Sequence, residues 1–182
     1  RKRPVLVEEK GIASPLEATP DFNTKFDTVL SKRTTVFFWP DYSNPYQKLF
    51  YGADTPLFQS EPKEIDEAVS YLKKNKGQSA VFHLHWLNFL LKPGKAEKTK
   101  DLVSDFMQNC SEFVELGGRI FWTVHNISEH AGVHKDEEDR IHKFLIDISA
   151  AILVHGESAK KELIVSSTNL SPDKVHIIPH GN

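Results

Sequence analysis

The stretch that decides the fold is Phe-Trp-Thr-Val-His-Asn, residues 121–126. Its first four residues are aromatic or β-branched, which favours a β-strand, and a histidine and an asparagine follow at once. Residues 80–86, 151–156 and 175–181 repeat the pattern, because in each an apolar run of strand length leads into histidine. Histidines that follow several strands point to one edge of one sheet, and we expect the chemistry of the protein at that edge.

Helical segments separate these strands. Apolar residues at helical spacing predict a long helix over about 102–116 and another around 141–148. The other expected elements are a strand at 34–39, a short strand at 57–58, and helices at about 45–51, at 60–77 with Ser60 as its cap, and from 156 onward. Short apolar strands that alternate with helices are typical of an α/β fold, here a Rossmann-like parallel sheet with helices on both faces.

The edge at which parallel strands end is the expected site. Right-handed crossovers bring the C-terminal ends of all strands to that edge, where open sheets bind their ligands. The residues expected on this rim are Trp39, His83, His85, His125, Asn126, His155 and His180. Tyr42 and Tyr46 add hydroxyl groups, and Trp86 adds an aromatic face that suits a sugar ring or an apolar lipid. Trp39 and Trp86 fit a role in capping the core equally well.

His125 is the central candidate. A neutral imidazole at the end of a middle strand can hold a sugar hydroxyl, stabilise a developing charge or move a proton. Asn126 offers donors and an acceptor that orient a polar ligand. The plain alternative is that His125 only satisfies a backbone carbonyl in a tight loop.

The pair His83 and His85 suggests a different chemistry. Residues two apart on a strand point to the same face, so both rings could reach one metal ion, with His125, His130 and His134 completing the site. Against a barrel-type metal hydrolase, the chain carries about five strands rather than about eight, and no obvious carboxylate follows a later strand. Motifs for dinucleotides, nucleoside triphosphates and serine hydrolysis are also missing.

The composition of the chain limits the classes of protein to which it can belong. The chain has 182 residues and a net charge of −2, which argues against a dedicated nucleic-acid binder. Its single cysteine, Cys110, sits among helix-spaced apolar residues and is expected to be buried and reduced. No apolar run approaches the roughly 20 residues that span a bilayer, so we expect a cytoplasmic protein, with peripheral membrane contact still compatible. Residues 1–33 are expected to form an extended lead segment, and 34–182 the domain.

The chain carries several blocks in order: FWP at 38–40 with NPY at 44–46, HLHW at 83–86, TVHN at 123–126, VHGES at 154–158 and IIPHGN at 177–182. Together these blocks resemble the N-terminal half of a GT-B glycosyltransferase, closest to the family 4-like retaining enzymes of bacterial polysaccharide assembly. The resemblance covers about residues 34–182, and the order and spacing of the blocks carry it more than any single block.

The resemblance implies one half of a two-domain enzyme. In the family, an N-terminal Rossmann-like domain binds the acceptor and a C-terminal one binds the nucleotide sugar, with a paired-glutamate motif in the C-terminal domain. The Pro-His-Gly stretch, residues 179–181, is similar to the linker, so the donor domain is expected beyond this chain. His125 matches the histidine that contacts the donor sugar, and Asn126 and the loop 41–46 would line the acceptor side. Many members have a Gly-Gly loop where Asp41-Tyr42-Ser43-Asn44 stands here, so phosphate contact from this loop is not expected.

The resemblance therefore predicts an acceptor-binding domain for transfer of a hexose from a nucleotide sugar to a glycan or lipid-linked glycan. The donor would be bound by a missing C-terminal domain or a partner chain, near the inner face of the membrane, with no metal, cofactor or nucleic acid. The expected catalytic residue is His125, and the expected substrate-binding residues are Trp39, Asp41, Tyr42, Asn44, Tyr46, His83, His85, Trp86, Asn126, His155 and His180. Two alternatives stay open: a non-catalytic glycan-binding module or partner-dependent subunit, and the metal-dependent hydrolase.

Overall fold

The computed structural model describes residues 33–42, 44–52, 55–91, 95–126 and 134–180. Residues 33–182 form one compact unit. The expected lead segment lies outside the described residues except for Arg33, and His130 of the metal hypothesis lies outside them as well.

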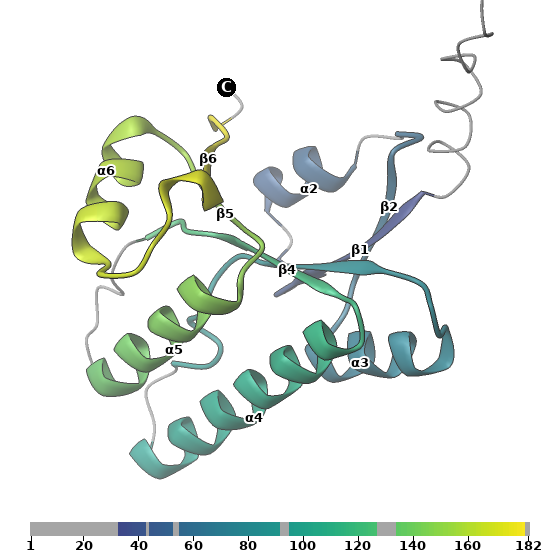
Figure 1. Cartoon of the computed structure of the whole chain (residues 1–182), viewed down its shortest axis with the longest axis horizontal. Coiled ribbons are helices and arrows are strands. Elements are labelled where there is room, and N and C mark those ends of the chain that lie inside the picture. The colour runs from purple at the N-terminus through teal and green to yellow at the C-terminus, as the bar shows by residue number, and fades with distance from the viewer. Residues whose placement is uncertain (1–32, 43, 53–54, 92–94, 127–133, 181–182) are drawn as a thin grey trace, which may run out of the picture. The chain divides into compact units, whose positions relative to one another are not determined.

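One six-stranded sheet organises the domain (Figure 1), and all of its strands are parallel. The strand order is β2-β1-β3-β4-β5-β6. The strands are β1 (Thr34–Trp39), β2 (Phe58–Pro62), β3 (Ala80–Leu84), β4 (Arg119–Thr123), β5 (Ala151–Val154) and β6 (Val175–Ile177). The expected α/β, Rossmann-like arrangement is confirmed.

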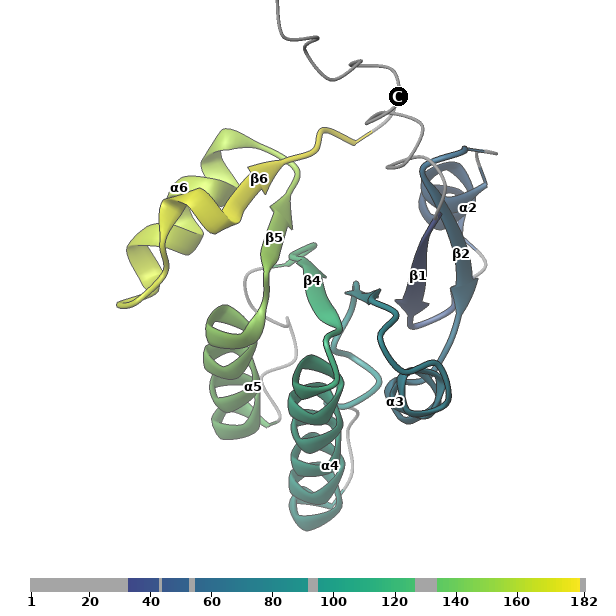
Figure 2. The ribbon, with the colours of Figure 1, turned by 45° about the vertical axis from the view of Figure 1, so that its right-hand side comes forward.

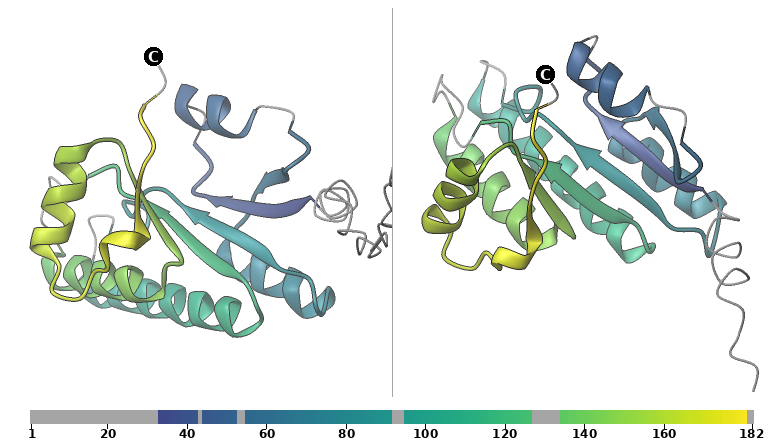
Figure 3. Two further views of the ribbon diagram at one scale, coloured as in Figure 1. Left: turned by 45° about the horizontal axis from the view of Figure 1, so that its top comes forward. Right: turned by 90° about the horizontal axis from the view of Figure 1, so that it is seen from above.

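The direction of each crossover decides which face its helix covers. The connections through α3 (Ile65–Lys74), α4 (Ala96–Glu115), α5 (Lys135–Ile148) and α6 (Glu157–Ser166) all lead toward β6, whereas α2 (Pro45–Tyr51) connects β1 back to β2. Right-handed crossovers therefore place α2 on the face opposite to the other helices. Figure 2 shows α3, α4 and α5 in a row along one side of the sheet, and Figure 3 shows α2 on the other side.

Alternation along the strands gives the two faces different chemistry. Toward α4, strands β3 and β4 present Phe82, Leu84, Ile120 and Trp122, all of which belong to the buried hydrophobic core. The intervening residues, such as His83 and Thr123, point to the other face and are also buried. One face thus holds the core, and the other buries polar groups.

The long helix α4 is the main support of the core face. Val103, Phe106, Cys110 and Phe113 form its buried stripe, and the expected burial of Cys110 is confirmed at 0% exposure. Leu102, the apolar residue at the start of the helix expected from the sequence, is 42% exposed and faces outward. The turn after the helix brings the Gly118 backbone against the Phe113 ring, where a side-chain Cβ would lie 2.3 Å from a ring carbon.

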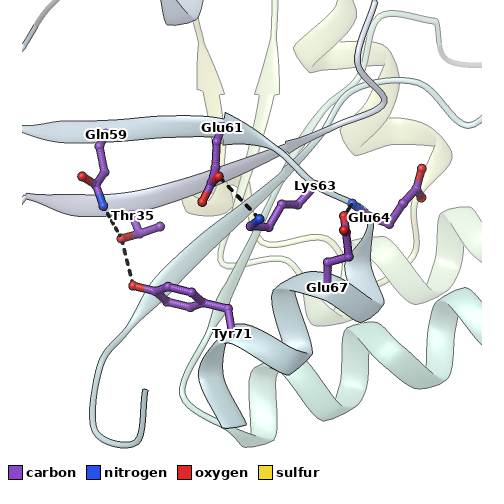
Figure 4. Close-up of polar contacts among 7 residues, drawn as sticks. All are labelled: Thr35, Gln59, Glu61, Lys63, Glu64, Glu67 and Tyr71. Atoms are coloured by element: carbon purple, nitrogen blue, oxygen red, sulfur yellow. Dashed lines mark hydrogen bonds and ion pairs between the residues drawn. The ribbon is translucent and has the colours of Figure 1, made fainter. Parts of the chain in front are cut away.

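The edge formed by β1, β2 and α3 is held by polar contacts (Figure 4). Gln59 Nε2 donates to Thr35 Oγ1 at 3.2 Å, and the Thr35 hydroxyl lies 3.5 Å from that of Tyr71. Ser60 was expected to cap the helix, but it lies within β2, and the helix begins after Glu64. Glu64 N–H donates to the Glu67 carboxylate at 3.0 Å, which satisfies a backbone donor at the helix start. The described residues include no helix that is both long and apolar enough to cross a bilayer.

Candidate functional site

Backbone hydrogen bonds carry the sheet past its strands and position the histidines at its C-terminal edge. His85 N–H donates to the Trp39 carbonyl at 2.9 Å, and Val124 N–H donates to the Leu153 carbonyl at 2.8 Å. Ile178 N–H donates to the Val154 carbonyl at 2.8 Å. Each bond fixes the backbone where a strand ends, so the side chains that follow start from rigid positions.

Five histidines meet at this edge, and we call them the imidazole cluster: His83, His85, His125, His155 and His180. Ring centroids of neighbours along this series lie 4.3, 5.5, 5.0 and 3.8 Å apart. His83 and His85 are buried, His125 and His155 are half-buried, and His180 is exposed. The expected gathering of these histidines is thus present in the structure, and it runs from the interior to the surface.

Hydrogen bonds link four of the rings in one series. His83 Nε2 lies 2.8 Å from Thr123 Oγ1, and the Tyr51 hydroxyl lies 2.6 Å from both His83 Nδ1 and His85 Nε2. His85 Nδ1 lies 3.2 Å from His125 Nε2, and His125 Nδ1 lies 3.2 Å from His155 Nε2. The series ends where His155 Nδ1 meets the Ile178 carbonyl at 2.9 Å.

The four linked rings are held uncharged. Burial, and next the neighbouring His125 ring, lowers the pKa of His83 to about 3. Burial lowers the pKa of His85 to about 2 and that of His125 to about 3, with adjacent imidazoles adding to both effects. Burial also lowers the pKa of His155, although its bond to the Ile178 carbonyl acts in the opposite direction. A neutral imidazole has one N–H donor and one acceptor nitrogen, so each ring can serve one neighbour in each way.

One carbonyl fixes the direction of the whole series. The Ile178 oxygen can only accept, so His155 carries its proton on Nδ1 and offers the Nε2 lone pair to His125. The same logic puts a proton on Nδ1 of His125 and of His85, and it makes the Tyr51 hydroxyl donate to His85. Tyr51 oxygen then accepts from His83 Nδ1–H, and the Thr123 hydroxyl donates to His83 Nε2. Every donor and acceptor in the series is matched.

Helix α2 covers this series with aromatic side chains. The Tyr46 ring stands edge-on to four of the imidazoles, with centroid distances of 5.7 Å to His85, 5.1 Å to His125, 5.5 Å to His155 and 5.2 Å to His180. Phe50 packs on His83, and Tyr51 stacks on Phe38 of β1. The segment after β6 passes close to this helix (Figure 3), which brings His180 to Tyr46.

Burial also keeps the two phenols of this helix protonated. It raises the pKa of Tyr51, and the nearby Tyr46 adds to the effect. Burial raises the pKa of Tyr46 as well, while its hydrogen bond with Thr123 works against the shift. The site therefore consists of neutral polar groups that can donate and accept hydrogen bonds.

The loop and the first turn of α2 are anchored by side chains. Asn44 caps the helix by accepting from Gln47 N–H at 2.8 Å, and Pro45 occupies the first turn, as expected. The buried Gln47 donates to the Pro40 carbonyl at 2.7 Å and accepts from Tyr42 N–H at 2.7 Å. These bonds position the helix that carries Tyr46 and Tyr51.

Of the expected rim residues, Trp39 does not join the cluster. It ends β1 at the right edge, but alternation turns its side chain to the core face, where it is 7% exposed and packs on Phe106 and Phe89. Trp86 does join, since its ring stacks on His125 at 4.2 Å with an interplanar angle of 13°. Tyr42 packs on Trp86 and donates to Asn88 Oδ1 at 2.9 Å. Asp41 and Asn126 are exposed.

Among its members that the structure describes, the metal set suggested by the His-x-His pair is not assembled. His83 and His85 do share one face, but the Tyr51 hydroxyl already bridges them. His134 lies at the start of α5, where its Nε2 is 3.3 Å from Thr99 Oγ1 of α4. Another trio does offer converging nitrogens: one ligand atom each from His125, His155 and His180, all within 4.8 Å of one another.

Three hollows among the described residues lie near the site. A shallow one of about 410 Å³ borders the cluster through Tyr51 and is lined by Phe38, Asp41, Tyr42, Gln47, Lys48, Tyr51, Gly52, Ser60 and Pro62. A second, of about 450 Å³, lies between α5 and α6 and is lined by residues such as Trp122, His142 and Asn169, but by no member of the imidazole cluster. A third, much smaller hollow borders the cluster directly, because His85, Trp86, His125 and Asn126 line it.

Sequence reasoning missed Tyr51, Thr123 and Gln47. Thr123 could have been found, because it ends β4 two residues before His125, and alternation continued along the chain places both side chains on one face. Tyr46, Phe50 and Tyr51 have the i, i+4, i+5 spacing of one helix face, which could have marked α2 as an aromatic cover. Nothing in the sequence shows that Gln47 turns inward.

Removing the Tyr51 hydroxyl tests the hydrogen-bonded series. Tyr51→Phe leaves one ring nitrogen of His83 and one of His85 buried without a partner, and we expect it to lower the free energy of unfolding by about 1–3 kcal/mol. Tyr42→Phe is the matched control, because its hydroxyl bonds to Asn88 at the surface, and it should change stability by less than about 0.5 kcal/mol. Urea unfolding measures both, and equal stability of Tyr51→Phe and wild type would contradict the series.

Acid should destabilise the domain through the buried imidazoles. The unfolded chain takes up protons on histidine below about pH 6.5, whereas folded His83 and His85 stay neutral until far lower pH. The unfolded state therefore binds more protons, and the free energy of unfolding falls with decreasing pH by up to ~1.4 kcal/mol per pH unit for each such ring. Urea unfolding between pH 7.5 and 4.5 measures how the free energy of unfolding changes per pH unit. His83→Gln should reduce this slope by about the contribution of one buried histidine, up to ~1.4 kcal/mol per pH unit. A variant slope equal to that of wild type would contradict neutral burial of His83.

Two comparisons with known proteins found no match. No model of a known protein family matches the chain, and a search of curated proteins found no significant match. The chemistry of the site therefore carries the functional assignment.

Proposed function

We propose that residues 34–182 form the acceptor-binding domain of a GT-B glycosyltransferase, which transfers a hexose from a nucleotide sugar to a glycan or lipid-linked glycan. The observation that carries this proposal is the imidazole cluster with its aromatic cover at the C-terminal edge of a parallel sheet. Open α/β sheets bind their ligands at that edge.

The chemistry of the edge favours an uncharged, hydroxyl-rich ligand. Its polar groups are neutral imidazoles and phenols, which offer donors and acceptors without net charge. The hydrogen bonds that hold the four linked rings come from hydroxyl groups, other imidazoles and one backbone carbonyl. Trp86 and Tyr46 add aromatic surface against which the apolar face of a sugar can pack.

His125 is the proposed catalytic residue. Its Nδ1–H donates to half-buried His155, so a sugar hydroxyl that displaces this contact would receive the same hydrogen bond. Its other nitrogen accepts from His85, which holds the ring in one orientation and one tautomer. Stacking on Trp86 fixes the ring plane as well. Such a preorganised donor holds a hydroxyl of the donor sugar in place, so the sugar keeps the orientation that transfer requires.

The hollow beside α2 is the proposed acceptor side. Asp41 and Tyr42 line it and supply a carboxylate and a ring that an acceptor glycan can contact. Asn44 contributes indirectly, because it caps the helix that carries Tyr46. The leaving diphosphate of the donor would be stabilised by a second domain joined through residues 179–181 or by a partner chain, in the cytoplasm where nucleotide sugars are used.

Transfer by the complete gene product tests this proposal. The full-length protein, together with any partner encoded beside it, is assayed with a panel of nucleotide sugars and glycan or lipid-linked acceptors. We expect His125→Ala to lower kcat by about 10²–10³-fold, the usual cost of losing one preorganised donor. His176→Ala is the matched control, since His176 is exposed on β6, and it should leave the rate unchanged.

Two results would count against the proposal. Unchanged turnover of His125→Ala would remove the assigned role of this residue. Glycan binding by the full-length protein without consumption of any nucleotide sugar would instead favour a binding module.

A further inference from the structure

We propose that His125, His155 and His180 form a binding site for one transition-metal ion, preferentially Zn²⁺, a property that goes beyond sugar transfer. Each residue places one ring nitrogen within 4.8 Å of the other two. The trio comes from the ends of β4 and β5 and from the segment after β6, so two of its members follow adjacent strands of the rigid sheet.

The spacing of the two inner ligands already suits a metal ion. His125 Nδ1 and His155 Nε2 lie 3.2 Å apart. Two nitrogens bound to a tetrahedral Zn²⁺ at about 2.0–2.1 Å are about 3.3–3.4 Å apart, so these rings need almost no movement. His180 must approach by at most about 1.5 Å from its present limit of 4.8 Å, and as an exposed residue beyond β6 it can do so.

Both inner rings have the outer partners that metal-bound histidines require. His155 Nδ1 donates to the Ile178 carbonyl at 2.9 Å, which leaves Nε2 free to bind the ion. His125 Nε2 faces His85 Nδ1 at 3.2 Å, so it can donate there when Nδ1 binds the ion. Partners of this kind fix the orientation and tautomer of metal ligands.

Metal binding must reverse the hydrogen-bonded series. Without metal, His125 carries its proton on Nδ1; with metal, that nitrogen needs its lone pair and the proton resides on Nε2. His125 then donates to His85 Nδ1, His85 Nε2–H donates to Tyr51, and the Tyr51 hydroxyl donates to His83 Nδ1. His83 Nε2–H finally donates to Thr123 Oγ1. Each ring keeps one proton throughout, so the rings neither release nor take up a proton.

The ligand set selects the class of ion. Three neutral imidazoles suit Zn²⁺ and its neighbours Co²⁺, Ni²⁺ and Cu²⁺, whereas Mg²⁺ and Ca²⁺ require oxygen ligands. Three histidines leave a fourth position of a tetrahedral ion for water or another small ligand. Because the ion would occupy the His125 nitrogen that faces the sugar in the proposed function, bound metal should compete with transfer.

Titration with Co²⁺ and Zn²⁺ alone tests the site, independently of sugar transfer. The chain is used without a histidine tag, at pH 7.5, and Co²⁺ is followed by its visible absorption and Zn²⁺ by calorimetry. We expect one ion per chain and four-coordinate Co²⁺. His180→Ala should weaken binding by roughly 100-fold or more, since loss of even an outer partner costs ~10–100-fold. His180 is exposed, so this variant should fold, which thermal unfolding without metal verifies.

His176→Ala is the matched control, because it removes an exposed histidine only four residues away and should bind as tightly as wild type. The proton positions give a second readout, since Zn²⁺ should move the His125 proton from Nδ1 to Nε2 in ¹⁵N spectra. The proposal is overturned if no saturable 1:1 binding occurs, if His180→Ala binds as tightly as wild type, or if His176→Ala loses as much affinity as His180→Ala. Loss of transfer activity alone has no bearing on these results.

Discussion

The hydrogen bond from His155 Nδ1 to the Ile178 carbonyl is the constraint on which the site depends. The carbonyl is itself fixed, because Ile178 N–H extends the pairing of β6 with β5. Since a carbonyl oxygen cannot donate, it determines the tautomer of His155 and, through contacts of 2.6–3.2 Å, those of His125, His85 and His83. A backbone group at the edge of the sheet thus controls the chemistry of side chains on three strands.

The fold supports this series because the two faces of the sheet bury different residues, apolar side chains on one face and polar side chains on the other. Alternation along β3 and β4 gives the apolar residues to α4 and turns His83 and Thr123 toward α2. Burying polar groups costs free energy unless each is paired, and the series pairs every one that it contains. The same burial keeps the rings neutral, which suits both a sugar hydroxyl and a metal ion. Sugar transfer and metal binding are therefore two proposals for the same nitrogen, Nδ1 of His125.

Much of this architecture could be predicted from local patterns. Apolar runs ending in histidine predicted the parallel sheet, and the gathering of His85, His125 and His155 followed from the common edge of its strands. The prediction for Trp39 was wrong because it considered only that this residue ends its strand at the C-terminal edge. Alternation along the strand decides which face of the sheet a side chain lies on, and it turns Trp39 into the core. Ser60 seemed a suitable cap, but pairing of β2 with β1 prevailed over this local preference. The tautomers depend on a carbonyl 23 residues from His155, for which the sequence has no signal.

The position of the protons on the histidine rings tests the central claim most directly. Two- and three-bond ¹H–¹⁵N correlation spectra of the folded chain at pH 7, with a chelator present, distinguish Nδ1–H, Nε2–H and doubly protonated rings. We expect neutral His83, His85, His125 and His155, each with its proton on Nδ1. A proton on Nε2 of His155, or a charged ring at His125 or His85, would contradict it.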